Sequence, residues 1–109
     1  MSNHYHEKKD LGLFKDMQRL APVDFEAWLN LDKIVGRTDG AIPQKYRELI
    51  AVAVAVTTQC PYCIDVHAKA VKAAGGSPEE LVEAAFIAAA LRAGGGATHG
   101  AMALKLFGE

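Results

Sequence analysis

Two segments of this 109-residue chain are apolar on nearly every side, and they strongly limit how it can fold. The segments are residues 49–56 and 81–91, and both are rich in alanine. A helix that is apolar all round has to be buried on every side. A chain this short has difficulty hiding two such helices by itself. We therefore expect a homo-oligomer whose subunits share this core.

The first of these segments can be interpreted in two ways. Val52, Val54 and Val56 alternate with alanines, which is a pattern typical of a strand. Alanine, however, is a strong helix former and a poor strand former, and Pro43 suits the start of a helix. The sequence favours a buried helix over residues 44–58, with a strand as the alternative.

Signals for helix ends divide the rest of the chain. Ser77-Pro78-Glu79-Glu80 combines a capping serine, a first-turn proline and a capping-box acid, and Gly75-Gly76 is typical of a helix C-cap. Asp24 is expected to cap a helix, and the three glycines from Gly94 to Gly96 are expected to break the last helical stretch. The expected helices span residues 11–20, 24–31, 44–58, 61–74, 78–92 and 97–107.

These signals predict an all-α fold of about six helices with short loops. We expect one domain over residues 1–109, with a polar and flexible segment over residues 1–10. Phe14, Trp28 and Phe86 are expected to be core residues.

Composition excludes several functional classes. The net charge is −1, and no clustered basic surface indicates nucleic-acid binding. No apolar run approaches the roughly 20 residues that cross a membrane, and the polar N-terminus does not resemble a secretory signal. We expect a cytoplasmic protein. No nucleotide, haem or flavin signature is present, so we expect no organic cofactor.

The only two cysteines form one C-x-x-C motif, Cys60-Pro61-Tyr62-Cys63. Pro61 is placed where a helix would begin, so Cys60 is expected to be the N-cap and Cys63 a first-turn residue. A helix N-terminus favours thiolate over thiol. His67 lies one turn after Cys63 on the same face. In the cytosol such a pair is expected to be redox-active or metal-binding rather than a permanent staple.

A dithiol of this kind can reduce a peroxide. One thiolate becomes a sulfenic acid, and the second thiol condenses with it to a disulfide. His67 can relay protons near neutral pH. Glu48 lies twelve residues before Cys60 on the preceding helix, and a helical hairpin could bring its carboxylate back to the site, although the spacing alone does not establish this.

The pattern Glu48-x11-Cys60-x2-Cys63-x3-His67 resembles the signature of the alkylhydroperoxidase D-like (AhpD-like) family, within the carboxymuconolactone decarboxylase superfamily. The resemblance covers roughly residues 43–107. It implies an all-α fold, homo-oligomers that are commonly trimers or hexamers, and thiol peroxidase or disulfide reductase activity in antioxidant defence. The decarboxylase branch of the superfamily does not depend on this cysteine pair.

The resemblance also implies a role for each site residue. Cys63 would attack the peroxide, Cys60 would donate a proton and close the redox disulfide, and His67 and Glu48 would form the proton relay. The substrate would be a small hydroperoxide, and a dithiol or protein reductant would reset the disulfide. Members of the family often have a histidine where this chain has Tyr62. Tyr62 and His99 are candidates for lining the site.

Two other classes stay open from the sequence. Cys60-Pro61-Tyr62-Cys63 is also the motif of glutaredoxin-like electron carriers, which need strands around the motif. Alternatively, Cys60, Cys63, His67 and His99 could form a zinc site in a structural module. The thiols could also act as a redox sensor.

Overall fold

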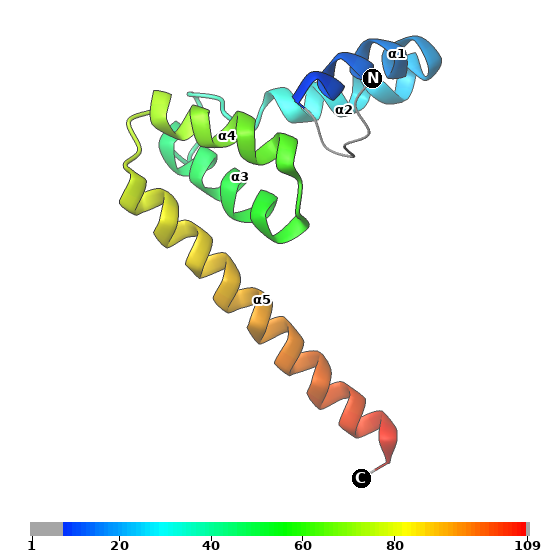
Figure 1. The fold of residues 1–109 in the computed structure, drawn as a ribbon, viewed down its shortest axis with the longest axis vertical. Helices are drawn as coiled ribbons and strands as arrows, with labels where there is room; N and C mark the ends of the chain where they lie inside the picture. The colour runs from blue at the N-terminus through cyan, green and yellow to red at the C-terminus, as the bar shows by residue number, and fades with distance from the viewer. Residues whose placement is uncertain (1–7, 109) are drawn as a thin grey trace.

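The computed structural model describes residues 8–108, and within that range it contains helices and no strand. A 3₁₀ helix, η1 (Lys8–Leu13), leads into α1 (Phe14–Leu20) and α2 (Pro22–Lys33). A loop then precedes α3 (Gln44–Thr58), α4 (Pro61–Ala73) and the long α5 (Pro78–Phe107), as Figure 1 shows. The predicted all-α fold is confirmed, and the helical interpretation of residues 44–58 is correct. The strands required by the glutaredoxin alternative do not occur over residues 8–108.

The centre of the fold is a hairpin of α3 and α4, with the first part of α5 packed against α3 (Figure 1). The chain reverses at Gln59, which has a left-handed φ of 57° and ends α3. Val52 and Ala55 of α3 and Val71 of α4 are buried between the helices. Alanines allow these helices to approach closely, so this alternation of alanine and valine serves a helical core rather than a strand.

The N-terminal helices form a smaller aromatic cluster apart from this hairpin. Phe14 of α1 packs edge-on against Phe25 and Trp28 of α2, with ring centroids 5.8 and 5.5 Å away. Phe25 is buried, but Phe14 and Trp28 remain 37% and 45% exposed. The prediction that Asp24 caps α2 is wrong, because Pro22 occupies the first helical turn and Ala21 is the N-cap. A proline there has its φ already set for a helix.

The prediction of a break at Gly94–Gly96 is also wrong. The two expected helices are one continuous helix, α5, and the three glycines lie inside it. Each interior glycine costs about 1 kcal/mol relative to alanine, but extending an existing helix requires no new nucleation. The alanines and leucines on either side therefore keep the helix continuous across the three glycines.

Most of α5 has no partner in a single chain. Ala88 is its one buried residue, and every residue from 89 to 108 is exposed. Figure 1 shows this half of α5 extending away from the hairpin. Phe86 is 71% exposed, so its prediction as a core residue is not met within one chain. The predicted homo-oligomer would cover this surface and stays a prediction.

Among the described residues, α5 is the one helix long and apolar enough to cross a membrane by length and composition. The sequence prediction that no apolar run approaches this length is wrong, because the glycines at 94–96 do not interrupt the helix. Core helices of soluble proteins pass the same test, so the finding does not by itself make α5 a membrane span.

The predicted caps around α4 and α5 are confirmed. Gly75 has a φ of 88° just after α4, and the N–H groups of Gly75 and Gly76 donate to Lys72 and Val71. Ser77 caps α5 in a full capping box with Glu80. The predicted flexible segment over residues 1–10 lies mostly outside the described residues, and Lys8–Asp10 belong to η1.

Candidate redox site

Cys60 and Cys63 form a disulfide at the start of α4, with their Cα atoms 5.3 Å apart. Cys60 is the N-cap, in an extended conformation, and its Sγ accepts a hydrogen bond of 3.3 Å from the backbone N–H of Cys63. Pro61 occupies the first turn. The predicted local structure is confirmed, and both sulfurs lie at the positive end of a helix dipole, where anions are stabilised.

Glu48 and His67 face each other across the hairpin. His67 Nδ1 and Glu48 Oε2 are 2.6 Å apart, and the Glu48 side chain is only 7% exposed. When Nδ1 carries the hydrogen and donates to this carboxylate, Nε2 is left as a proton acceptor. Lys45, three residues before Glu48 on α3, pairs with Glu80 of α5 instead. The hairpin thus brings Glu48 back to His67.

Gly36 completes the surroundings of this carboxylate. It lies in the loop before α3, and a Cβ atom at that position would overlap Glu48 Oε1. The loop backbone can therefore approach the carboxylate only because residue 36 has no side chain. Sequence reasoning missed Gly36, because no local signal connects a loop glycine with a carboxylate twelve positions later.

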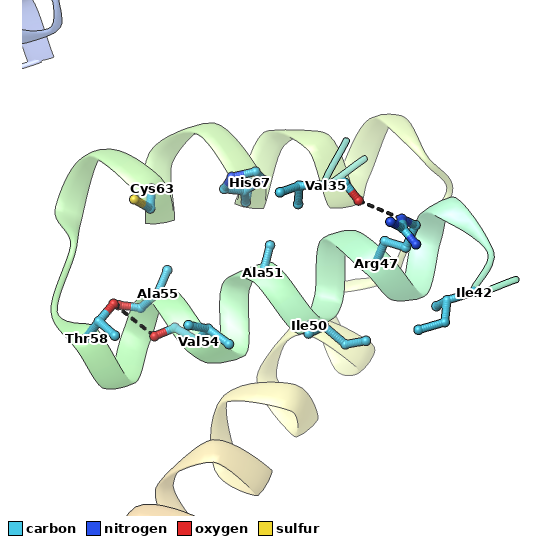
Figure 2. Close-up of a pocket in the computed structure, with 10 residues that line it drawn as sticks. All are labelled: Val35, Ile42, Arg47, Ile50, Ala51, Val54, Ala55, Thr58, Cys63 and His67. Atoms are coloured by element: carbon cyan, nitrogen blue, oxygen red, sulfur yellow. Dashed lines mark hydrogen bonds between the residues drawn. The ribbon is translucent and has the colours of Figure 1, made fainter. Parts of the chain in front are cut away.

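A cavity of about 430 Å³ opens beside these residues. Figure 2 shows Cys63 and His67 on α4, above Ala51 and Ala55 of α3. The cavity wall is mostly apolar, and Arg47 lies at its far end. The full lining comprises Val35, Ile42, Arg47, Ile50, Ala51, Val54, Ala55, Thr58, Cys63 and His67. One cysteine of the disulfide and the histidine therefore line the same apolar cavity.

Arg47 was not recognised from the sequence. Its Nε donates to Val35 O at 2.8 Å and its Nη2 to Ile34 O at 3.1 Å. The signal that could have found it is a charged residue next to Glu48, just before the apolar part of α3.

The two other candidate lining residues lie elsewhere. Tyr62 is not part of the cavity wall, and its hydroxyl donates to Asp10 Oδ2 at 2.9 Å. His99 is exposed on the distal half of α5 and does not line the cavity within one chain, so its role at the site stays a prediction. The zinc alternative therefore lacks its fourth ligand, His99, within one chain. Over residues 8–108, no group of three His, Cys, Asp or Glu side chains is placed to hold a metal.

This arrangement supplies the parts for thiol redox chemistry. Two sulfurs are close enough to bridge, one of them opens onto a cavity, and a histidine oriented by a buried carboxylate lies one turn away. The carboxylate fixes which ring nitrogen carries the proton, as in other nucleophile and base pairs.

Comparisons with known proteins agree with the fold. The sequence model of the carboxymuconolactone decarboxylase family matches residues 24–106, so the match includes nearly all of α2 as well as the hairpin and α5. A protein of Paracoccus denitrificans named "Uncharacterized protein 4 in cox locus" is 43% identical over 84 residues, which cover 77% of this chain and 75% of that protein. The chain belongs to the carboxymuconolactone decarboxylase family, which includes the AhpD-like proteins.

Proposed function

We propose that the protein is a thiol-dependent peroxidase that reduces organic hydroperoxides in antioxidant defence. The observation that carries this proposal is the shared cavity: Cys63 of the redox pair and His67, which is held by the buried Glu48, line the same space. A hydroperoxide in that space would meet the nucleophile and the proton relay together.

The first step uses Cys63. Its thiolate attacks the terminal oxygen of the hydroperoxide, the O–O bond breaks, and Cys63 becomes a sulfenic acid. The leaving alkoxide takes a proton from the His67–Glu48 relay and departs as an alcohol. The helix N-terminus stabilises the thiolate before the attack.

The second step uses Cys60. Its thiol loses a proton to the relay, the sulfur attacks the sulfur of Cys63, and the sulfenic oxygen leaves as water. The product is the Cys60–Cys63 disulfide that the structure contains. A dithiol reductant then resets the pair by two exchange steps and is itself oxidised to a disulfide.

Disulfide reductase activity is the second candidate, and the same cysteine pair supports it. Cys63 is exposed, so its sulfur is accessible to another thiol. In that reaction the reduced pair would attack a disulfide of the substrate rather than a peroxide, and two substrate thiols would be released.

A free-thiol titration tests the peroxidase proposal. Reduced protein is treated with one equivalent of an organic hydroperoxide, and thiols and peroxide are counted before and after. We expect both thiols to disappear together, Cys63→Ser to be inert, and Cys60→Ser to stop at a sulfenic acid. His67→Ala is expected to slow the reaction, whereas His99→Ala, a histidine outside the cavity, is not. Free thiols and unconsumed peroxide would contradict the proposal.

We also propose that the protein acts in the cytoplasm as a homo-oligomer, a trimer or a hexamer. The exposed apolar surface of α5 supports this, since Phe86, Leu91 and Leu106 are each more than two thirds exposed in a single chain. A second copy packed on α5 would remove this surface from water.

A further inference from the structure

We propose that the cavity binds a medium-chain carboxylic acid that carries the hydroperoxide group, with the carboxylate on Arg47 and the peroxide at Cys63. The inference rests on the proposed function for the peroxide and adds the class of substrate. It depends on three features of the cavity: its one cationic end, its apolar wall, and its length.

Arg47 has a positive charge that no carboxylate neutralises over residues 8–108. The ion pairs in this range join other residues. Its two hydrogen bonds, to Val35 O and Ile34 O, are to neutral carbonyl groups. A guanidinium has five N–H donors in a fork that matches a carboxylate, so donors remain for a ligand.

The loop beside Arg47 strengthens this positive end. A Cβ atom on Gly40 would lie 2.8 Å from Arg47 Nη1 and 2.9 Å from Arg37 Nε. Two guanidinium groups therefore flank one glycine. Arg37 has an exposed partner, Asp39, at 3.8 Å, which is a weak pair in water. The absence of a side chain at Gly40 leaves Nη1 accessible.

The wall between the two ends suits a hydrocarbon chain. Ile50, Ala51 and Val54 of α3 line it, together with Val35 and Ile42 from the loop. Figure 2 shows Ala51, Val54 and Ile50 between Cys63 at one end and Arg47 at the other, with Ile42 beyond Arg47. Each methylene group buried there is expected to strengthen binding about fourfold.

The distance between the two ends of the cavity can be estimated from the rise of α3. Cys63 lies over the part of α3 that contains Ala55, eight residues after Arg47 (Figure 2). At about 1.5 Å per residue this is roughly 12 Å along the helix, which an extended chain of about ten carbon atoms can span. The volume of about 430 Å³ is in the range of small-molecule sites.

Calorimetry with unreactive probes tests the ligand class without any turnover. Octanoate and octan-1-ol are titrated into the oxidised protein, followed by hexanoate and decanoate. We expect octanoate to bind at least about tenfold more tightly than octan-1-ol, because an arginine and a carboxylate form a charge-assisted pair. Affinity is expected to rise with chain length from hexanoate to decanoate.

Variants assign this preference to one residue. Arg47→Gln is expected to abolish the preference for the acid over the alcohol, and Arg47→Lys to keep part of it. Arg92→Gln, which removes the same charge from the exposed part of α5, is expected to keep all of it. If Arg47→Gln fails to fold, the comparison of acid with alcohol in the wild type and in Arg47→Lys still decides.

Several results would overturn the inference. These are equal binding of octanoate and octan-1-ol, a preference that survives Arg47→Gln, or no binding of either probe because a second copy fills the cavity. Failure of the peroxidase proposal gives a different result: octanoate would bind through Arg47, and no hydroperoxide would be consumed. If peroxide is consumed, a ten-carbon hydroperoxy acid should exceed its methyl ester in kcat/KM by about tenfold in the wild type and in Arg92→Gln, but not in Arg47→Gln.

Discussion

Replacing Gly36 with alanine is expected to disable the proton relay through one methyl group. That Cβ atom would overlap Glu48 Oε1 and lie 3.3 Å from Glu48 Cδ. The φ angle of Gly36 is outside the left-handed region, so alanine fits the backbone there. The carboxylate has to move away from the loop, and the 2.6 Å hydrogen bond to His67 Nδ1 is lost or lengthened.

The size of the effect follows from that bond. A hydrogen bond to a charged group contributes about 1.5–3 kcal/mol, and a loss of 1 kcal/mol lowers Tm by about 4–8 °C in a domain of this size. We expect the Tm of Gly36→Ala to fall by at least about 5 °C. Peroxidase kcat/KM is expected to fall about 100-fold, the typical effect of misplacing a catalytic group by about 1 Å.

Thermal denaturation and steady-state peroxide consumption measure the two effects. Gly94→Ala is the matched control, because a Cβ atom there meets nothing within 4 Å and alanine stabilises a helix interior by about 1 kcal/mol. In a Glu48→Ala background, Gly36→Ala should have no further effect, since the carboxylate it would strike is absent. An active Gly36→Ala with an unchanged Tm would refute the reasoning.

Four other predictions test the capping box of α5, the N-terminal contact and the oligomer. Ser77→Ala is expected to reduce the free energy of unfolding by about 1 kcal/mol. The hydrogen bond from the Ser77 backbone N–H, followed by that from Lys45, lowers the pKa of Glu80 below 4.5. Its stabilisation is therefore present above pH 4.5 and is lost as pH falls through the lower folded-state pKa, and Glu80→Gln should remove this pH dependence from urea denaturation. Tyr62→Phe, which removes the 2.9 Å hydrogen bond to Asp10, should speed proteolysis near η1. Phe86→Glu should reduce the molar mass measured by light scattering, and an unchanged mass would contradict an oligomer built on α5.

Local signals in the sequence were sufficient to predict the start of α4 and the start of α5. Cys60, which Pro61 follows, accepts a hydrogen bond from the N–H of Cys63, and Ser77 accepts one from the N–H of Glu80. Each bond joins residues three positions apart, so a short stretch of sequence is enough to predict it. The pairing of Glu48 with His67 was predicted from the family resemblance rather than from spacing. It depends on the reversal at Gln59, whose left-handed φ is unusual for a residue other than glycine.

The parts that the sequence did not reveal depend on contacts between distant residues or on the whole length of a helix. Gly36 and Arg47 matter because the loop before α3 folds back over that helix, which no helical periodicity encodes. The glycines at 94–96 indicated a break, but their unfavourable helix propensity is outweighed by the helix that continues before and after them. His99, beside those glycines, was only a candidate for lining the site, and within one chain the continuous helix places it away from the cavity.

Cys60 combines a structural and a chemical role, and its sulfur takes part in both: Sγ accepts the cap hydrogen bond from the Cys63 N–H and is also half of the disulfide. The start of α4 is further supported by the extended backbone of Cys60 and by Pro61, whose ring sets φ whether or not the S–S bond exists. Reduction therefore frees both sulfurs without removing the start of α4. The N–H of Cys63 still points at the Cys60 sulfur, where it stabilises the thiolate that attacks the sulfenic acid. We expect the far-UV circular dichroism of reduced and oxidised protein to coincide, and a loss of helix on reduction would show that the disulfide holds α4 in place.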